Sequence, residues 1–246
     1  MSATPVDSPR LALANGGPLP VTAAKAPMMD DAAHATIGVK DLRFSYRKGG
    51  EELYDGLSYT FSPGQVTAVT GESGRGKSTL LYVLGLLLTP TSGRVEIDGE
   101  PVSHLPDRRR SLLRAQRLGF VFQDSELDPT RTILDSVMEP GLYGGADRAS
   151  LESRALELLA QFGLSERSHH KPGQTSGGQA QRVAVCRALI NSPDFVLADE
   201  PTGNLDPRNS TLVLDALAAA ASEGRTVIVA THDPFVIERS DQVLAL

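Results

Sequence analysis

Three scarcities limit what this chain can be. Its 246 residues include one cysteine, no tryptophan and 12 aromatic residues, counted as 5 Tyr and 7 Phe. A lone Cys186 cannot form an internal disulfide, so nothing in the sequence indicates an oxidising compartment. The densest apolar run, residues 80–88, is 9 residues long and contains Gly85. Because a membrane-spanning helix needs about 20 apolar residues, we expect no segment of this chain to cross a bilayer.

The sequence also lacks a secretion signal and an excess of positive charge. The apolar residues 11–14 are ended at once by Asn-Gly-Gly-Pro at 15–18, so we expect no secretion. With 24 basic and 30 acidic residues the formal net charge is −6, which argues against nucleic acid as a partner. The arginines at 108–110, 114 and 117 form a basic run. Helical spacing spreads them over more than one face, so we interpret them as a solvated surface rather than a site for nucleic acid or anionic lipid.

Residues 1–36 differ in composition from everything after them. In this segment 21 of the 36 residues are Ala, Pro, Gly, Ser or Thr, and none is aromatic or Ile. Such a stretch buries too little apolar surface to offset its ordering entropy, so we expect a disordered tail. Met28 and Met29 near its end leave two hypotheses open: translation begins there, or the tail is a genuine unstructured extension.

From Ile37 onward, short β-branched runs alternate with helical patterns, which is typical of an α/β fold. The expected strands are residues 39–46, 57–61, 65–70, 94–97, 120–122, 195–198 and 226–230. Three of them, at 66–69, 195–198 and 227–230, are apolar nearly throughout, as central parallel strands are. A helix with apolar residues at helical spacing covers 151–162, and Asp206 with Pro207 begins another that ends near Gly224.

A glycine-rich loop follows the expected strand 65–70 and precedes an expected helix at 79–88. It reads Gly71, Glu72, Ser73, Gly74, Arg75, Gly76, Lys77, Ser78, and Thr79 follows. Glycines let such a loop turn its backbone N–H groups inward onto phosphates, and the helix N-terminus adds positive potential. Lys77 is then placed to reach the β- and γ-phosphates, and Ser78 to ligate Mg²⁺. The loop predicts binding of ATP or GTP.

A second acidic site narrows the choice among nucleotide-binding proteins. The apolar run 195–198 ends in Asp199 and Glu200, which places two carboxylates at the C-terminal edge of the sheet, where open α/β folds bind ligands. Asp199 suits the Mg²⁺ that bridges phosphate oxygens, and Glu200 suits a water attacking the terminal phosphate. The sequence therefore predicts nucleotide hydrolysis.

A third motif carries a resemblance to a known family. Residues 175–182, Thr-Ser-Gly-Gly-Gln-Ala-Gln-Arg, resemble the signature sequence of ATP-binding cassette (ABC) ATPases, with Thr175 in place of the usual leading Leu. The resemblance covers residues 37–246 with its motifs in family order. It implies an ABC cassette with a mostly parallel core sheet, an antiparallel β part near the N-terminus, and a helical subdomain inserted at about 124–191. The residues that it implies for nucleotide and Mg²⁺ are Tyr46 (adenine stacking), Gln123 (Mg²⁺ and water), Ser176, Gly177, Gly178, Gln179, Asp206 and the switch histidine His232.

The same resemblance implies partners. Ser176 to Gln179 open a helix and so form a second anion site, and in the family two copies pack head to tail so that each signature closes over the partner's ATP. Glu200 would act as general base, with His232 contacting the γ-phosphate. Without membrane helices, the chain would power a separate permease docked near residues 124–143, at the inner face of the cell membrane, on the cytoplasmic side. Residues 198–206 look most like the lipoprotein-releasing, macrolide-exporting and cell-division-type subgroup.

Two other functions stay open beside an export or lipoprotein, peptide or drug transporter. One is an ATPase that regulates a membrane-coupled cell-wall or cell-division process without transport. The other is an ABC ATPase acting on DNA or the ribosome, which the single cassette and the absence of a long coiled coil disfavour. The family usually continues past the last strand, whereas here the sequence ends at Leu246, so we expect an edge strand to be missing.

Overall fold

The computed structural model describes residues 35–47, 49–203 and 205–246, so most of the expected tail lies outside the described residues. The strands are β1 (Ile37–Phe44), β2 (Leu53–Phe61), β3 (Val66–Thr70), β4 (Ser92–Ile97), β5 (Glu100–Pro101), β6 (Leu118–Val121), β7 (Phe195–Asp199), β8 (Thr226–Ala230) and β9 (Gln242–Ala245). The helices are α1 (Lys77–Leu84), α2 (Asp107–Arg117), α3 (Ile133–Tyr143), α4 (Arg148–Gln161), α5 (Gly177–Leu189), α6 (Pro207–Ser222) and α7 (Pro234–Glu238), with 3-10 turns at Ser165–Arg167 and Pro172–Gln174.

The core is a five-stranded sheet in the order β6-β7-β8-β3-β9, and all of its pairs are parallel. β7 and β8 are buried at every position, which explains their continuous apolar sequence. Successive side chains of β7 serve opposite faces: Phe195 and Leu197 pack with α1, whereas Val196 and Ala198 pack with α5 and α6. The sheet is therefore covered on both sides, and its carboxyl edge is left to present β3, β7 and β8 to a ligand.

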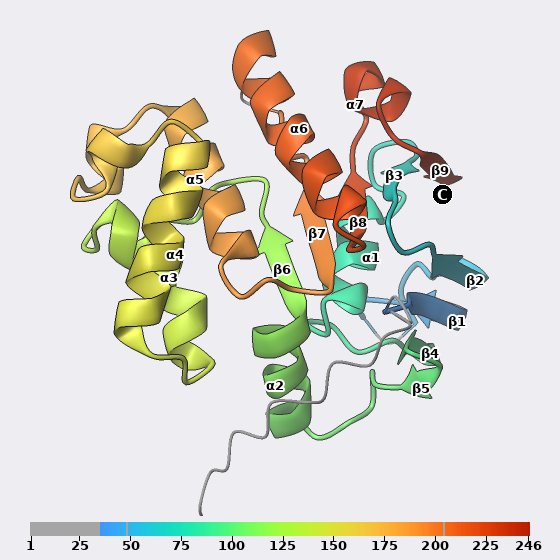
Figure 1. The fold of residues 1–246 in the computed structure, drawn as a ribbon. Coiled ribbons are helices and arrows are strands. Elements are labelled where there is room, and N and C mark those ends of the chain that lie inside the picture. The colour runs from blue at the N-terminus through green and yellow to red at the C-terminus, as the bar shows by residue number, and fades with distance from the viewer. Residues whose placement is uncertain (1–34, 48, 204) are drawn as a thin grey trace, which may run out of the picture. The chain divides into compact units, whose positions relative to one another are not determined.

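A second, antiparallel sheet has the order β2-β1-β4-β5. Its apolar face, including Ile37, Leu42 and Phe61, closes over α1 in one buried cluster with β7 and β8. In Figure 1 this sheet lies at the lower right, and α1 runs between it and the core sheet. α1 is thus held from two sides, and the loop that begins it is fixed by both sheets.

The segment between β6 and β7 holds α3, α4 and α5, which stand beside the sheet next to β6 (Figure 1). Ile133, Val137, Leu158 and Leu159 join the buried cluster of α5 and α6. Thr132 caps α3 through the amide of Asp135, and Asp147 caps α4 through the amide of Ser150. The architecture confirms the expected α/β cassette with parallel core, antiparallel part and helical insertion.

Element boundaries differ from the expected ones where local backbone geometry decides them. β2 begins at Leu53 rather than 57, because Leu53 still pairs with Phe44 of β1 across an irregular stretch in which Tyr54, Asp55 and Gly56 take positive φ values of 74°, 26° and 81°. α1 begins at Lys77 and ends at Leu84, well short of residue 88, because Gly85 and Leu86 leave the helical conformation. β9 forms the edge of the core sheet beside β3. No helix among the described residues is long and apolar enough to cross a membrane.

Candidate nucleotide site

The phosphate loop joins β3 to α1 at the carboxyl edge of the core sheet. Gly71 and Gly76 adopt φ values of 147° and 91°, which non-glycine residues rarely take. A Cβ on Gly76 would lie 2.7 Å from the Tyr54 hydroxyl oxygen, so a side chain does not fit there. Lys77 Nζ donates to the Gly71 and Glu72 carbonyl oxygens at 2.9 and 3.2 Å. The ammonium therefore lies across the mouth of the loop, within reach of any phosphate that the loop holds.

Asp199 ends β7 and faces the start of α1. Its Oδ1 accepts from Ser78 Oγ at 2.9 Å, and its Oδ2 accepts from the Tyr82 hydroxyl at 3.4 Å. Only 1% of Asp199 is exposed, and burial raises the pKa of its carboxyl, partly opposed by the Ser78 hydrogen bond. The half-buried Ser78 hydroxyl and the buried Asp199 carboxylate are oxygen donors of the kind Mg²⁺ prefers. Among the described residues no group of three or more His, Cys, Asp or Glu could hold a metal ion.

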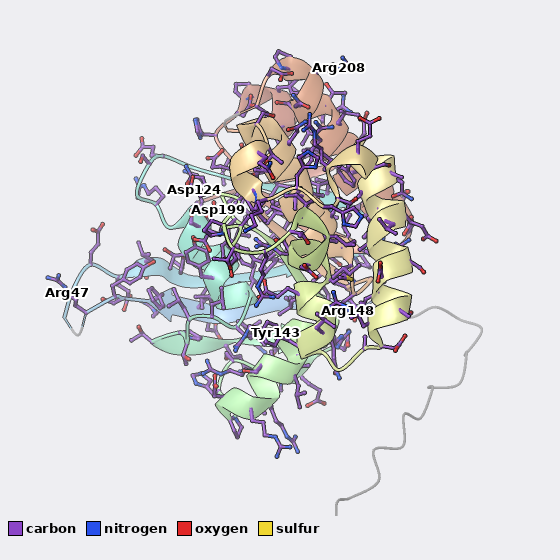
Figure 2. All side chains as sticks on the ribbon, turned by 90° about the vertical axis from the view of Figure 1, so that its left-hand side faces the viewer. Arg47, Asp124, Tyr143, Arg148, Asp199 and Arg208 are labelled. Atoms are coloured by element: carbon purple, nitrogen blue, oxygen red, sulfur yellow. The ribbon has the colours of Figure 1, made fainter. Side chains whose placement is uncertain are left out.

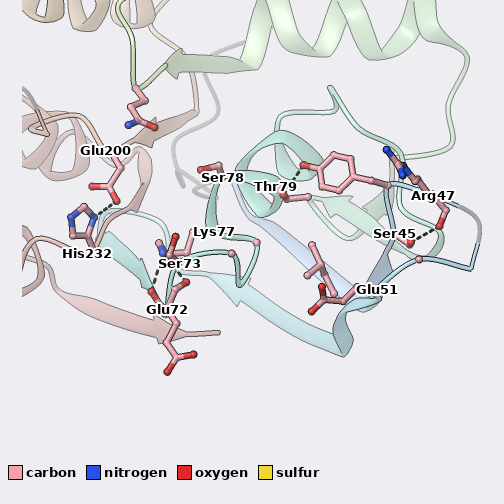
Figure 3. Close-up of a pocket in the computed structure, with 17 residues that line it drawn as sticks. Ser45, Arg47, Glu51, Glu72, Ser73, Lys77, Ser78, Thr79, Glu200 and His232 are labelled. Carbon is pink, nitrogen blue, oxygen red and sulfur yellow. Dashed lines mark hydrogen bonds and ion pairs between the residues drawn. The ribbon is translucent and has the colours of Figure 1, made fainter.

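Glu200 follows β7 in a strained conformation, with a φ of 43°. Its N–H donates to the Ala230 carbonyl at 2.9 Å, which fixes the turn against β8. Its Oε1 lies 2.6 Å from His232 Nδ1, and its Oε2 accepts from Thr231 Oγ1 at 3.1 Å (Figure 3). An ionised carboxylate only accepts, so with Glu200 ionised this hydrogen bond requires the His232 tautomer that carries a proton on Nδ1. Glu200 and His232 form a pair held by the end of β8.

A cavity of about 890 Å³ gathers most of the expected site residues. Its lining consists of Ser45, Tyr46, Arg47, Gly50, Glu51, Leu53, Gly71, Glu72, Ser73, Gly74, Gly76, Lys77, Ser78, Thr79, Gln123, Glu200 and His232. Figure 3 shows Lys77 and Ser78 between the Glu200–His232 pair on one side and the Ser45 to Glu51 segment on the other. The end opposite the Glu200–His232 pair carries the Tyr46 ring and Leu53 beside the charged Arg47 and Glu51.

Three expected residues differ in their relation to the cavity: Tyr46 and Gln123 line it from outside the phosphate loop, whereas Arg75, within the loop, does not. Tyr46 is 66% exposed and its ring meets Phe44 edge-on at 4.9 Å, while its hydroxyl lies 2.8 Å from Thr79 Oγ1. Gln123, two residues beyond β6, is exposed and lines the cavity. Arg75 points outward and forms a 3.6 Å ion pair with Glu72, so its side chain is not part of the lining.

The signature residues lie at the start of α5, outside the lining of this cavity. Ser176 caps α5 by accepting from the Gln179 amide at 3.2 Å, and Gln179 Oε1 accepts from the Ser176 amide at 2.9 Å. A Cβ on Gly177 would meet no atom within 4 Å, whereas one on Gly178 would lie 3.2 Å from the Asn209 side-chain nitrogen. Asp206 caps α6 through the Asn209 amide at 3.0 Å, and these hydrogen bonds lower the pKa of its carboxyl. None of the residues 176–179 or 206 lines the cavity.

Sequence reasoning missed residues that hold the site from behind. Tyr54 donates to the Gly76 carbonyl at 2.6 Å. From α5, Gln181 donates to the Phe122 carbonyl at 3.2 Å, and Arg187 donates to the Ser125 and Glu126 carbonyls at 2.9 and 3.0 Å. These bonds tie the segment around Gln123 to the signature helix. The buried Gln181 lies within the signature-like segment 175–182, which was a usable signal, whereas no sequence pattern pointed to Tyr54.

A glycine-rich loop between a parallel strand and a helix, beside an acid-tipped neighbouring strand, defines a P-loop nucleotide-binding protein. The sequence pattern of the family described as "ABC transporter" matches residues 54–203. The chain belongs to this family, and it is an ATP-hydrolysing cassette.

Relatives and solved structures are similar over most of the chain. The "Lipoprotein-releasing system ATP-binding protein LolD 1" of Rhodospirillum rubrum is 45% identical over 86% of this chain and 95% of its own. The "Macrolide export ATP-binding/permease protein MacB" of Rhodopseudomonas palustris is 44% identical over 87% of this chain, which spans 33% of that longer protein. A dimeric structure of MJ0796, a bacterial ABC transporter cassette, matches with a TM-score of 0.79 at 35% identity, covering 85% of this chain and 94% of that one. A second MJ0796 dimer, a post-hydrolysis state bound to ADP and Pi, has a TM-score of 0.78 at 34% identity over the same shares of the two chains.

Proposed function

We propose that this chain is the ATP-hydrolysing subunit that drives a separate membrane permease of the lipoprotein-releasing or macrolide-exporting kind. The observation that carries this proposal is the cavity, because it brings Lys77, Ser78 and the Glu200–His232 pair to one edge of the sheet. The relatives named for lipoprotein release and macrolide export support the choice of permease. The chain would lie against the inner face of the cell membrane through that partner.

For hydrolysis, we assign Glu200 to orient and deprotonate the attacking water. Its carboxylate lines the cavity, and its side chain is 12% exposed, so it is reachable from the cavity but shielded from bulk solvent. His232, whose side chain is 78% exposed, would contact the γ-phosphate. Lys77 contributes charge-assisted hydrogen bonds to the phosphates.

Ser78 Oγ and Asp199 Oδ1 would hold Mg²⁺, with Gln123 supplying a further oxygen from across the cavity. When bound, Mg²⁺ neutralises charge that develops on the phosphate oxygens. The raised pKa of the Asp199 carboxyl fits this role, because a buried carboxylate gains most from a cation that compensates its charge.

The signature segment would act on the ATP of a second copy of this chain. Ser176 to Gln179 present the N-terminus of a 13-residue helix at a surface that the chain's own cavity does not reach. The dimeric MJ0796 cassettes support a paired arrangement. ATP would then join two half-sites, and its hydrolysis would separate them.

The permease would dock on a second cavity, of about 470 Å³, between α2, α3 and α5. Ser111, Arg114, Glu139, Tyr143 and Arg187 line it, among others. Tyr143 is 76% exposed at the end of α3 (Figure 2), so a large aromatic ring is available there for contact with a partner protein. Arg187 also holds the Ser125 and Glu126 carbonyls, which links this surface to Gln123 in the nucleotide cavity.

The test is purification of the tagged chain from native membranes, followed by ATPase measurement with and without the copurified polytopic protein. The proposal expects the complex to hydrolyse ATP faster than the isolated chain. Tyr143→Glu should abolish that stimulation and leave the basal rate intact, whereas Leu156→Glu, at a 41% exposed apolar position on α4, should preserve it. Equal stimulation in both variants, or no stimulating membrane partner, would contradict the proposal.

A further inference from the structure

Tyr54 stands in a backbone conformation that is costly for a bulky residue. Its φ is 74°, and Asp55 and Gly56 follow at 26° and 81°. Positive φ at an aromatic residue is rare and persists only where surrounding contacts enforce it. The pairing of β1 with β2 shifts register at this place, between Leu42 and Phe44. The strand is therefore bent at Tyr54 and not merely loosely paired.

Ion pairs from β1 hold this bend. Arg43 Nη1 binds Glu52 Oε1 at 2.5 Å and Asp55 Oδ1 at 3.1 Å. The Arg43 guanidinium thus forms ion pairs with the residues on both sides of Leu53 and Tyr54. These pairs lie on the solvent side of the turn, whereas the Tyr54 side chain reaches the phosphate loop.

The Tyr54 side chain ends on the phosphate loop. Its hydroxyl donates to the Gly76 carbonyl at 2.6 Å, within the range of a well-formed O–H···O hydrogen bond. Burial raises the pKa of this hydroxyl, so it stays protonated and able to donate. Gly76 is the N-cap of α1, has a left-handed backbone conformation, and receives no side-chain cap. Its carbonyl also accepts from the Leu80 amide at 2.8 Å, so the Tyr54 bond fixes the first turn of α1.

We propose that Tyr54 is a positioning residue for phosphate binding: its hydroxyl, held by the bent β2, fixes the Gly76 peptide and with it Lys77 and Ser78. This inference rests on the proposed nucleotide chemistry of the cavity. The Tyr46 hydroxyl on Thr79 Oγ1 braces the same turn two residues beyond Lys77, from the end of β1. The antiparallel sheet therefore orients the cations and hydroxyls that face the phosphates, in addition to lining the cavity.

The test compares Tyr54→Phe with Tyr59→Phe. Each removes one phenolic oxygen from β2, but the Tyr59 hydroxyl binds Gln242 Oε1 at 3.1 Å, away from the loop. We expect Tyr54→Phe to weaken ADP and ATP binding about fivefold to tenfold, the effect of one lost hydrogen bond, and to raise KM with little change in kcat. Tyr59→Phe should bind both nucleotides like wild type. AMP lacks the β-phosphate, so both variants should bind AMP with the affinity of the wild type.

Equal ADP affinity in Tyr54→Phe and wild type would overturn the inference, even if the variant melts earlier. If the wild type itself bound neither ADP nor ATP, the proposed function would be refuted instead. A measurement on the unaltered chain guards against an unstable variant: hydrogen exchange with magnesium pyrophosphate, which can occupy the loop but carries no base. The inference expects protection at residues 53–56 as well as 71–79, and protection confined to 71–79 would overturn it.

Discussion

The phosphate loop and the signature segment both present a helix N-terminus, yet they differ in what surrounds it. The loop before α1 is enclosed, because Lys77, Ser78 and Thr79 each hydrogen-bond within the chain and line one cavity. The start of α5 is open, because Ser176 and Gln179 hydrogen-bond to each other and no atom lies within 4 Å of a Cβ placed on Gly177. A self-sufficient anion site binds a ligand alone. We expect the exposed start of α5 to act on a ligand held by another molecule.

The largest expected effect follows from Glu200→Gln, which keeps the shape of the enclosed site and removes its base. We expect ATP turnover to fall by about 10²- to 10⁴-fold, the range for loss of a positioned base. ATP affinity should persist, and an ATP-bound dimer should accumulate. Single-turnover hydrolysis measures the rate, and light scattering measures the dimer. A turnover near that of the wild type would remove Glu200 from its assigned role.

Next comes Lys77→Ala, which attacks binding at the enclosed site rather than chemistry. Losing charge-assisted bonds to the phosphates should weaken ATP binding by roughly 100-fold. Calorimetric titration with ATP gives the affinity, and adenosine serves as a ligand that the change should not affect. An ATP affinity within a factor of two of wild type would show that Lys77 does not face the phosphates.

Gly177→Asp addresses the open site without disturbing the enclosed one. Nothing lies within 4 Å of a Cβ at this position, and an acidic residue in the first turn of a helix is favourable for the fold. The new charge should repel the partner's phosphates and lower hydrolysis and ATP-dependent dimerisation about tenfold or more, with monomer ATP affinity unchanged. Gly177→Asn, of the same size but neutral, is the control and should lose much less; equal loss in both would point to crowding instead of charge.

The smallest effect concerns stability. Burial raises the pKa of Asp199 above its ordinary value of 3.8, so its carboxyl binds a proton more tightly in the folded than in the unfolded chain. The charged form therefore costs stability, and the cost is absent below the ordinary value and complete above the folded pKa. Asp199→Asn should raise the Tm of the nucleotide-free protein at pH 8 by about 2–4 °C, or roughly 1 kcal/mol.

That gain should stay constant above the pKa of the folded Asp199 carboxyl and shrink below it, and stabilisation by MgATP should be lost in the same variant. Thermal unfolding from pH 5 to pH 8.5, with and without MgATP, measures both. A gain that grows toward low pH would reverse the sign assigned to the buried carboxyl.

Sequence reasoning reached the parts of the site that depend on short, continuous motifs. The loop 71–79, the acids at the end of β7 and the Asp206 cap of α6 all lie where their local patterns placed them, because each is formed within one turn or one strand end. The catalytic roles assigned to these residues stay predictions. What sequence could not supply are contacts between distant segments.

The Tyr54 bond to Gly76 joins residues 22 positions apart, and the Arg187 bond to Ser125 joins residues 62 apart. The first depends on a bend in β2 that the apolar pattern hides, and this is also why β2 was expected to start four residues late. The separation of residues 176–179 from the cavity likewise emerges from the packing of α5 against β6 and α3, which no single motif encodes.

The most direct test of two half-sites on separate copies is a mixing experiment in the Glu200→Gln background. Chains carrying Lys77→Ala keep an intact signature, and chains carrying Gly177→Asp keep an intact phosphate loop. With MgATP, each alone should stay monomeric, and their mixture should form a dimer that holds one ATP. A mixture that remains monomeric, or a Gly177→Asp chain that dimerises alone, would contradict the account.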